Sequence, residues 1–298
     1  MIIHHIPVFR DSIVQLLQLQ HDTIFFDCTC GEGGHASIVL PCIPNGHYYG
    51  FDRDADALSV AHQRLSKIAS NFTLIPNNYA DIPDLIQSKT IPHPTVLFAD
   101  LGLSMFQLKT IKRGFSFLSE DPLLMRFDSD QSQYNAFDIV NHYPEKKLAD
   151  MIYEYGEERA SRKIAYFIVR ARQKKPIETC SELASIVAKA KGYRHHGRST
   201  HPATQTFQAL RIETNQEMVH LENLLNQLPF IMLSKGLVAI ISYHSIEDRK
   251  VKFFFRDSPD FEKWNKKVIK PSDDEIEINP AARSAKLRIG IRNEHSSS

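Results

Sequence analysis

Short apolar runs alternate with amphipathic stretches through the first hundred residues. The β-branched and aromatic runs predict strands, and the spacing of apolar residues between them predicts helices. We expect strands at residues 23–27, 47–52, 72–76 and 95–101, and helices near residues 12–19, 55–69 and 82–87. This alternation is typical of an α/β fold with a doubly wound, mostly parallel sheet. Such sheets bind ligands at the carboxyl ends of their strands.

The pattern changes after residue 101, where loop-like sequence is followed by consecutive helical patterns over residues 145–191. Alternating strand and helix signals then return. They predict a long helix at about 204–228, a strand at 236–243, a helix at 246–255, and strands near 266–269 and 286–291. We therefore predict a sheet domain built from residues 1–108 and 204–298, interrupted by a loop and helical domain at 109–203.

Composition adds one informative asymmetry. Hydrophobic residues at 42% and charged residues at 24% are ordinary for a globular chain, and the formal net charge is +1. Residues 1–100, however, carry five basic and ten acidic side chains, which leaves 31 basic and 25 acidic for the rest. Residues 145–200 alone hold 13 basic and 7 acidic side chains. A basic region of this kind indicates a polyanionic partner.

Localisation follows from what the sequence lacks. Four cysteines are too few for a disulfide framework in a chain of this length, which favours a reducing cytoplasm. The first ten residues do not form the apolar run of a secretory signal. The longest clean apolar stretch, residues 237–241, is far short of the ~20 residues that span a bilayer. We expect a cytoplasmic protein with no membrane partner.

The sequence DCTCGEGGH at residues 27–35 follows a strand and precedes a short helix. Glycines there let a backbone approach a ligand, and Asp52, at the end of the next strand, is placed to grip ribose hydroxyls. Asp52 could instead cap the following helix, a role that Asp54 can serve equally well. A dinucleotide site holds its pyrophosphate with a G-x-G-x-x-G turn and the start of a helix. Here the spacing is G-x-G-G and the helix before Pro41 is short, which favours S-adenosylmethionine over a dinucleotide.

Asp100 ends the fourth strand and precedes a glycine turn. A carboxylate there can accept a hydrogen bond from a nucleobase amine and direct the lone pair of that amine toward a methyl donor. Its alternative role is to cap a turn. Methylation at carbon 5 of a pyrimidine would need a cysteine nucleophile in this loop, and the chain has none between Cys42 and Cys180.

Many strings across the chain resemble, in one order, the MraW, or RsmH, family of methyltransferases. The matching segments are residues 5–8, 31–35, 52–54, 100–102, 107–108, 113–117, 125–126, 155–159, 201–204, 206–212, 244–245, 247–249, 279–280 and 283–288, with Asn141 and Asn215. The resemblance implies a class I methyltransferase sheet with a helical insert after the fourth strand. It also implies methyl transfer from S-adenosylmethionine to the exocyclic N4 amine of a cytidine in small-subunit (16S) ribosomal RNA.

The resemblance further implies a set of site residues. Those expected to bind the donor are Gly33, Gly34, His35, Asp52, Tyr79, Asp100 and Gln107. The catalytic candidates are Asp100, Ser104 and His244, of which His244 could equally be a histidine satisfied by the backbone. No metal site is expected, because the histidines at 195, 196 and 201 lack ligand spacing.

Basic residues in the insert and around the expected mouth of the site are candidate RNA contacts. They are Arg113, Arg126, Arg170, Arg172, Lys174, Lys175, Arg211 and Arg249. Any one of them could instead form a surface ion pair or lie on a solvated helix face. The partner would be ribosomal RNA or an assembled small subunit, and whether the chain forms a homodimer is left open.

Two alternatives remain at this point. Met105, Phe106 and Leu124 depart from the residues usual in the family, where a serine, a proline and an acidic residue stand. They favour a non-catalytic, RNA-binding ribosome assembly factor that retains a relic donor site. The other alternative is a Rossmann-type NAD-dependent oxidoreductase.

Overall fold

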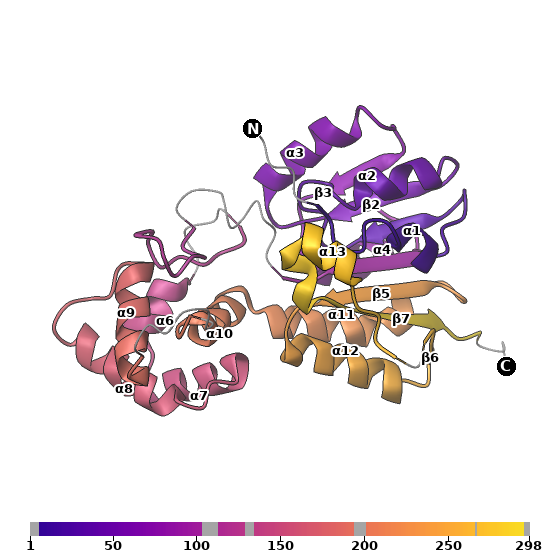
Figure 1. Cartoon of the computed structure of the whole chain (residues 1–298). Coiled ribbons are helices and arrows are strands. Elements are labelled where there is room, and N and C mark those ends of the chain that lie inside the picture. Colours follow the sequence, from indigo (N-terminus) through magenta and orange to yellow (C-terminus); the bar gives the residue numbers. More distant parts are fainter. Residues whose placement is uncertain (1–5, 103–112, 129–133, 194–200, 266, 295–298) are drawn as a thin grey trace. The chain divides into compact units, whose positions relative to one another are not determined.

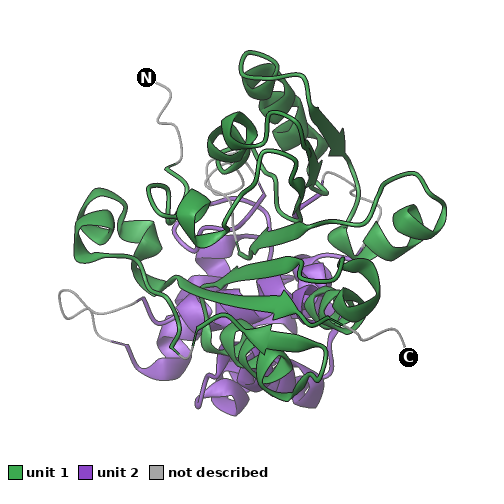
Figure 2. Ribbon diagram, turned by 90° about the vertical axis from the view of Figure 1, so that its right-hand side faces the viewer, with its two compact units in different colours: residues 1–106, 219–298 green, residues 107–218 purple. Residues whose placement is uncertain are grey.

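The computed structural model describes residues 6–102, 113–128, 134–193, 201–265 and 267–294. The chain divides into two compact units, which Figure 2 shows in green and purple. Unit 1 comprises Met1–Phe106 and Val219–Ser298, and unit 2 comprises Gln107–Met218. Each unit has its own hydrophobic core. An insert within a discontinuous sheet unit was predicted, but the chain returns to unit 1 at Val219 and not at residue 204.

A seven-stranded sheet forms the centre of unit 1 (Figure 1). Its strands, in spatial order, are β3 (Phe72–Ile75), β2 (His47–Phe51), β1 (Ile24–Asp27), β4 (Val96–Asp100), β5 (Leu237–Ser242), β7 (Lys286–Arg292) and β6 (Phe261–Lys263). The five strands from β3 to β5 are parallel, and β7 runs antiparallel to both of its neighbours. The predicted doubly wound, mostly parallel sheet is confirmed. Strand order reverses between β1 and β4, which makes their carboxyl ends the switch point where ligands bind.

The central strands are apolar on both faces, as a parallel sheet covered by helices requires. All six residues of β5 are buried, and so are the first four of β4. The helices of this unit are α1 (Ile13–Leu16), α2 (Ala36–Val39), α3 (Ala55–Leu65), α4 (Ile82–Gln87), α11 (Glu217–Ile231), α12 (Ser245–Asp257) and α13 (Asp273–Ile278), with 3-10 turns at Leu40–Cys42, Tyr79–Asp81 and Pro280–Ser284. Glu217 and Met218, the first two residues of α11, belong to unit 2.

Unit 2 is helical in its described parts. Its helices are α6 (Ala136–His142), α7 (Glu145–Gly156), α8 (Ser161–Arg172), α9 (Cys180–Lys191) and α10 (Thr204–Asn215). Capping boxes start two of them, built by Asn135 with Asp138 on α6 and by Thr179 with Glu182 on α9. Side chains of this kind satisfy the N–H groups that a helix start leaves without partners.

Two predicted elements differ from the structure. The helix expected at 204–228 is interrupted at Gln216, whose φ of +51° ends α10 before α11 begins. The side chain of Asn215 donates to the carbonyl groups of Arg211 and Met125, so this turn is fixed to unit 2.

α10 also packs closely on α7, since a Cβ added at Gly156 would lie 2.6 Å from the carbonyl oxygen of Gln205.

The second difference concerns the strand predicted near 266–269. The sixth strand lies earlier, at Phe261–Lys263, where it pairs with β7 and buries Phe261. Ile269 forms only an isolated bridge to Leu287. Pairing is decided here by which apolar side chain reaches the core, a tertiary contact that local pattern does not contain.

Candidate functional site

Four neighbouring strands of unit 1 bring polar residues to one edge of the sheet. Asp27 ends β1, Asp52 follows β2, Asp100 ends β4 and Tyr243 follows β5. Because these strands are parallel, their carboxyl ends lie at the same edge, on both sides of the switch point. Asp52 and Asp100 were both predicted at strand ends. The contact between Tyr243 and Asp100 was not predicted.

The loop after β1 turns tightly over the start of the site. Gly31 and Gly33 have φ values of +51° and +75°, a conformation that glycine adopts without strain. A Cβ at Gly33 would lie 3.3 Å from the Cβ of Ala61 in α3, so this position is crowded as well. At Gly34 a Cβ would make only ordinary contacts. Of the two glycines predicted to bind the donor, Gly33 is therefore the one that the fold itself requires.

Asp52 holds this loop through hydrogen bonds to backbone. Its carboxylate accepts from the N–H of Gly31 at 2.8 Å and from that of Asp54 at 2.9 Å. Burial raises the pKa of Asp52 to about 6, against the opposing effect of these two bonds. The N-cap of α3 is Asp54, whose side chain accepts from Asp56 and Ala57. Capping, the alternative role for Asp52, is thus filled by its neighbour.

Asp100, at the end of β4, is also largely enclosed. Its carboxylate accepts a hydrogen bond from the Tyr243 hydroxyl at 2.8 Å and lies 3.8 Å from Nδ1 of His35. Its own N–H donates to the Thr29 hydroxyl at 2.7 Å, which fixes the end of β4 against the loop after β1. Burial raises the pKa of Asp100 to about 6, although His35 and Tyr243 act to lower it. The side chain is 15% exposed, so one aspect remains open to a ligand.

His35 is oriented from its other side by the chain near the N-terminus. Its Nε2 lies 2.9 Å from the carbonyl oxygen of Val8, which can only accept, so Nε2 carries the proton and Nδ1 faces Asp100. The ring also packs edge-on against Phe98 of β4, with centroids 4.8 Å apart. His35 was predicted as a donor contact, and the structure places it beside Asp100.

Residues near the C-terminal end of the chain secure that N-terminal turn. The Glu275 carboxylate accepts from the N–H of Phe9, and the Asn279 amide donates to the carbonyl oxygen of Ile6 at 3.0 Å. We call residues 6–9 together with Glu275 and Asn279 the end clasp. The sequence shows both ends of this clasp as separate motifs, but only the structure shows that they meet.

Tyr79 lies just after β3, in the turn Tyr79–Asp81. Asn78 caps this turn by accepting from the N–H of Ala80. The ring of Tyr79 is half-buried and meets His220 edge-on, with centroids 6.4 Å apart. Its position past a strand end was predicted, and stacking on adenine stays a prediction.

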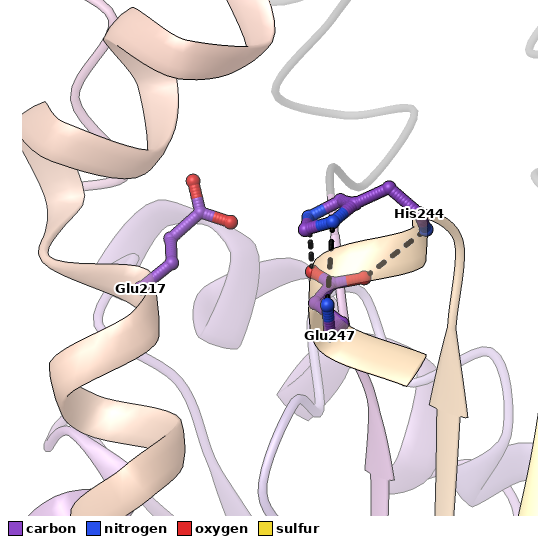
Figure 3. A group of neighbouring side chains, drawn as sticks. All are labelled: Glu217, His244 and Glu247. Carbon is purple, nitrogen blue, oxygen red and sulfur yellow. Dashed lines mark hydrogen bonds and ion pairs between the residues drawn. The ribbon is translucent and has the colours of Figure 1, made fainter. Parts of the chain in front are cut away.

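Figure 3 shows His244 in contact with Glu247 at the start of α12. Nδ1 of His244 accepts from the N–H of Glu247 at 3.4 Å, and Nε2 lies 3.0 Å from the Glu247 carboxylate. That carboxylate also accepts from the N–H of Tyr243 at 3.0 Å. Glu217, also drawn, has its carboxylate on the Arg211 guanidinium. The described contacts of His244 are those of a helix cap, the alternative that the sequence left open, and its catalytic role stays a prediction.

Ser104 and Gln107 lie outside the described residues, as do Met105 and Phe106, which depart from the family pattern. Their predicted roles stay predictions.

The basic residues predicted to contact RNA fall into two groups. Four of them are held by protein groups. Arg126 bonds the Asp128 carboxylate at 2.8 and 2.5 Å and the carbonyl oxygen of Tyr134. Arg172 donates to the carbonyl oxygens of Val140 and Tyr143, and Arg113 donates to the carbonyl oxygen of Phe127. Arg211 bonds the Glu217 carboxylate. Arg172 thus satisfies carbonyl groups at the C-terminal end of α6, a structural role that its position in a basic run did not indicate.

The other group is exposed. It consists of Arg170, Lys174 and Lys175 in unit 2 and Arg249 in unit 1. Lys175 lies 3.5 Å from both Glu178 and Glu182. Charge counts along the sequence could not tell these exposed side chains from the four that are held by protein groups.

A family model, described as the MraW methylase family, matches residues 2–293. The chain belongs to the MraW methylase family. It is 44% identical over 290 residues to "Ribosomal RNA small subunit methyltransferase H" of Coprothermobacter proteolyticus, covering 96% of this chain and 95% of that protein. The protein of the same name from Thermosipho africanus is 42% identical, with 97% of each chain covered. An rRNA methylase structure from Streptococcus thermophilus aligns over 99% of both chains at 14% identity and a TM-score of 0.42.

Membership in the MraW methylase family, together with the strand order, assigns unit 1 to the class I methyltransferase fold. It also supports S-adenosylmethionine as the cofactor and decides against the NAD-dependent oxidoreductase. The residues present fit this donor: Gly33 is crowded at a positive φ, and two buried acids suit a sulfonium cation better than a pyrophosphate. Within the described residues, no helix has the length and apolarity to cross a membrane.

Proposed function

We propose that this chain transfers a methyl group from S-adenosylmethionine to the exocyclic N4 amine of a cytidine in small-subunit ribosomal RNA. The observation that supports this most is Asp100, a nearly buried carboxylate at the switch point whose open aspect can accept an amine N–H. The names of the relatives support ribosomal RNA as the substrate. The preference for N4 of cytidine rests on the family resemblance.

When bound, the cofactor supplies an electrophilic methyl group on a sulfonium. The residues of the chain orient the acceptor. Asp100 accepts one N–H of the amine, which turns the nitrogen lone pair toward the methyl carbon and offsets positive charge as the N–C bond forms and the C–S bond breaks. The nitrogen then loses one proton, which the Asp100 carboxylate accepts and passes to water. The Tyr243 hydroxyl donates to Asp100 and holds its side chain in the orientation that this requires.

The two cysteines in the loop after β1 do not support covalent methylation at carbon. Cys28 and Cys30 are buried, and burial raises the pKa of both thiols well above the usual value. A thiol that stays protonated is a poor nucleophile. Direct transfer to an amine needs no such nucleophile.

Hypomethylated ribosomal RNA and small subunits, each incubated with labelled donor, test the proposal and also show which of the two is the substrate. The RNA is digested to nucleosides and compared with N4-methylcytidine and 5-methylcytidine standards. Label in N4-methylcytidine is the expected result. Label in 5-methylcytidine, or in another nucleoside, would refute the N4 assignment.

The second candidate, a non-catalytic assembly factor, is favoured by Met105 and Phe106, which stand where the family usually has serine and proline. It predicts binding of S-adenosylmethionine by calorimetry with no label in any RNA.

A cytoplasmic location is part of the main proposal, because ribosomal RNA and S-adenosylmethionine are found there.

A further inference from the structure

Helix α8 carries an unusual run of charge. Residues 161–175, which span this helix and the turn after it, contain six basic side chains and no acidic one. Two of the six are engaged within unit 2: Arg172 caps α6, and Lys175 lies between Glu178 and Glu182. The other four are Arg162, Lys163, Arg170 and Lys174, and all four are exposed. None forms an ion pair with a described residue.

Three of these side chains, those of Arg162, Lys163 and Arg170, share one face of α8. On a helix, residues spaced by four or seven lie along one stripe, so Arg162 and Arg170 flank Tyr166, and Lys163 lies beside them. Lys174 lies two residues past the end of α8, in the turn that follows it, and is exposed. Ile164, Ala165 and Ile168 lie on the opposite face, in the core of unit 2. From Arg162 to Arg170 the stripe measures about 12 Å along the axis. We call these five residues, Tyr166 included, the basic face of α8.

Tyr166 gives this face a second chemical property. Its side chain is 44% exposed, and the Arg170 guanidinium lies 5.3 Å from the ring centroid. Phe167 meets the same ring edge-on, with centroids 6.0 Å apart, which limits how far the ring can turn. An aromatic surface beside cations, with no acid nearby on the helix, is suited to a polyanion with exposed planar groups.

The neighbouring helix α7 shows what an ordinary solvated face looks like in this unit. Lys146 pairs with Asp150 four residues on, at 2.9 Å, and Glu145 and Glu154 lie on the same helix. Cations and acids are interspersed there, so their fields cancel within a short distance. The basic face of α8 has no such compensation from its own helix.

We propose that the basic face of α8 binds a single-stranded segment of the RNA substrate outside the methylated nucleotide, with phosphates on the four cations and one base stacked on Tyr166. This inference rests on the proposed function and adds where the strand is held and in what form. Single-stranded RNA fits better than duplex, because only an unpaired base can leave its stack to lie on an aromatic ring.

The salt dependence of binding tests the phosphate contacts. A fluorescent single-stranded oligoribonucleotide containing one cytidine is titrated with the full chain at several salt concentrations. For single strands, log K falls with log salt by about 0.7 per phosphate contacted. The double variants R162Q/K163Q and R170Q/K174Q should each lower this slope by about 1.4. The matched variant K146Q/K147Q on α7 removes the same charge and should leave the slope unchanged.

The stacking contact has a different signature. Y166A should weaken binding by between about 5-fold and 150-fold and leave the salt slope unchanged, because no phosphate contact is lost. Y166F should bind as the wild type does, since the ring and not the hydroxyl makes the contact. Thermal melting and calorimetric donor binding, both expected to match the wild type, show that each variant is folded.

Three outcomes would overturn the inference. Slopes and affinities equal to the wild type in both double variants would exclude phosphate contacts on this face. Equal weakening by the α7 variant would assign the effect to net charge alone. Normal binding of naked RNA with weakened binding of assembled subunits would indicate an acidic ribosomal protein as the partner.

The labelling assay separates this inference from the proposed function. Wild-type chain that marks N4 of cytidine, with α8 variants that bind RNA normally, would refute the inference alone. Loss of RNA affinity in the α8 variants, with no label from the wild type, would support the inference and refute the proposed function.

Discussion

The two units place opposite charges in opposite surroundings. In unit 1 the charges at the candidate site are acids, and they are enclosed: Asp27, Asp52 and Asp100 all have pKa values raised by burial. In unit 2 the basic face of α8 carries exposed bases, with no acid on its own helix. The bases that unit 2 encloses, such as Arg126, are bonded to acids or carbonyl groups.

This contrast shows that the role of a charged side chain is inferred better from its contacts and exposure than from the sign of its charge. Enclosed acids with an open aspect can respond to a cationic ligand at short range. Exposed bases without partners act on a polyanion over a Debye length of about 8 Å. An enclosed arginine bonded to acids and carbonyl groups stabilises the fold. The following predictions test this division, beginning with the largest expected effect.

Replacing Arg126 by alanine should damage the fold of unit 2. The side chain is 8% exposed and bonds both Asp128, which is 14% exposed, and the carbonyl oxygen of Tyr134, so its loss removes an ion pair that is largely shielded from water. We expect the free energy of unfolding in urea to fall by about 3–5 kcal/mol. Arg170→Gln, on the exposed face, should change it by less than about 0.5 kcal/mol. Similar losses in both variants would contradict the division between structural and available bases.

Replacing Asp100 by asparagine should remove catalysis and keep the fold. Asparagine can still accept from the Tyr243 hydroxyl, but it brings no negative charge to the amine. We expect kcat for methyl transfer to fall by about 100-fold to 1000-fold, as for the loss of one electrostatic contact to a transition state. Donor affinity by calorimetry should change much less. Unchanged turnover would remove Asp100 from the mechanism.

Donor binding should weaken in acid. Asp52 and Asp100 have pKa values of about 6, and only their ionised forms attract a sulfonium cation. At pH 5, one unit below that value, protonation of each carboxylate should lower the affinity for S-adenosylmethionine about tenfold relative to pH 7.5. S-adenosylhomocysteine, which lacks the positive charge, is the matched control ligand and should lose less. Equal loss for both ligands would assign the effect to hydrogen bonding by these acids and not to charge.

Replacing Tyr243 by phenylalanine should have the smallest effect. The hydroxyl lowers the pKa of Asp100 by donating to it, so its removal should raise that pKa above about 6. The acidic limb of the pH profile of kcat/KM should then move upward by about one unit, with a loss of only a few-fold at pH 7. If the limb stays where it is in the wild type, Tyr243 does not act through the carboxylate of Asp100.

Most of the sheet could be predicted from sequence, because buried parallel strands are continuous apolar runs and their ends carry the polar residues. The break at Gln216 could not, since the long apolar periodicity continues through it and the turn is fixed by Asn215 bonding across unit 2. The placement of β6 depended on where Phe261 reaches the core.

The candidate site was predictable where chemistry follows strand ends, as for Asp52 and Asp100. It was not predictable where contacts join distant segments. Nothing in local sequence links Tyr243 to Asp100, or Glu275 to the turn at Phe9. The arginines were the hardest to interpret, because Arg126, Arg172 and Arg211 have the same composition signal as exposed bases and differ only in their partners.

The end clasp has a consequence for the order in which the protein matures. During synthesis β1 to β4 emerge first, then all of unit 2, and only later β5, β7 and the residues that bind the turn at Phe9. Domains fold as units while the chain is made, so unit 2 can form its core while the half-finished sheet waits for its remaining strands. His35 receives its final support when Glu275 and Asn279 arrive. The candidate site is therefore among the last parts of the molecule to be completed, and a ribosome-bound fragment ending before Glu275 should have a folded insert and an incomplete candidate site.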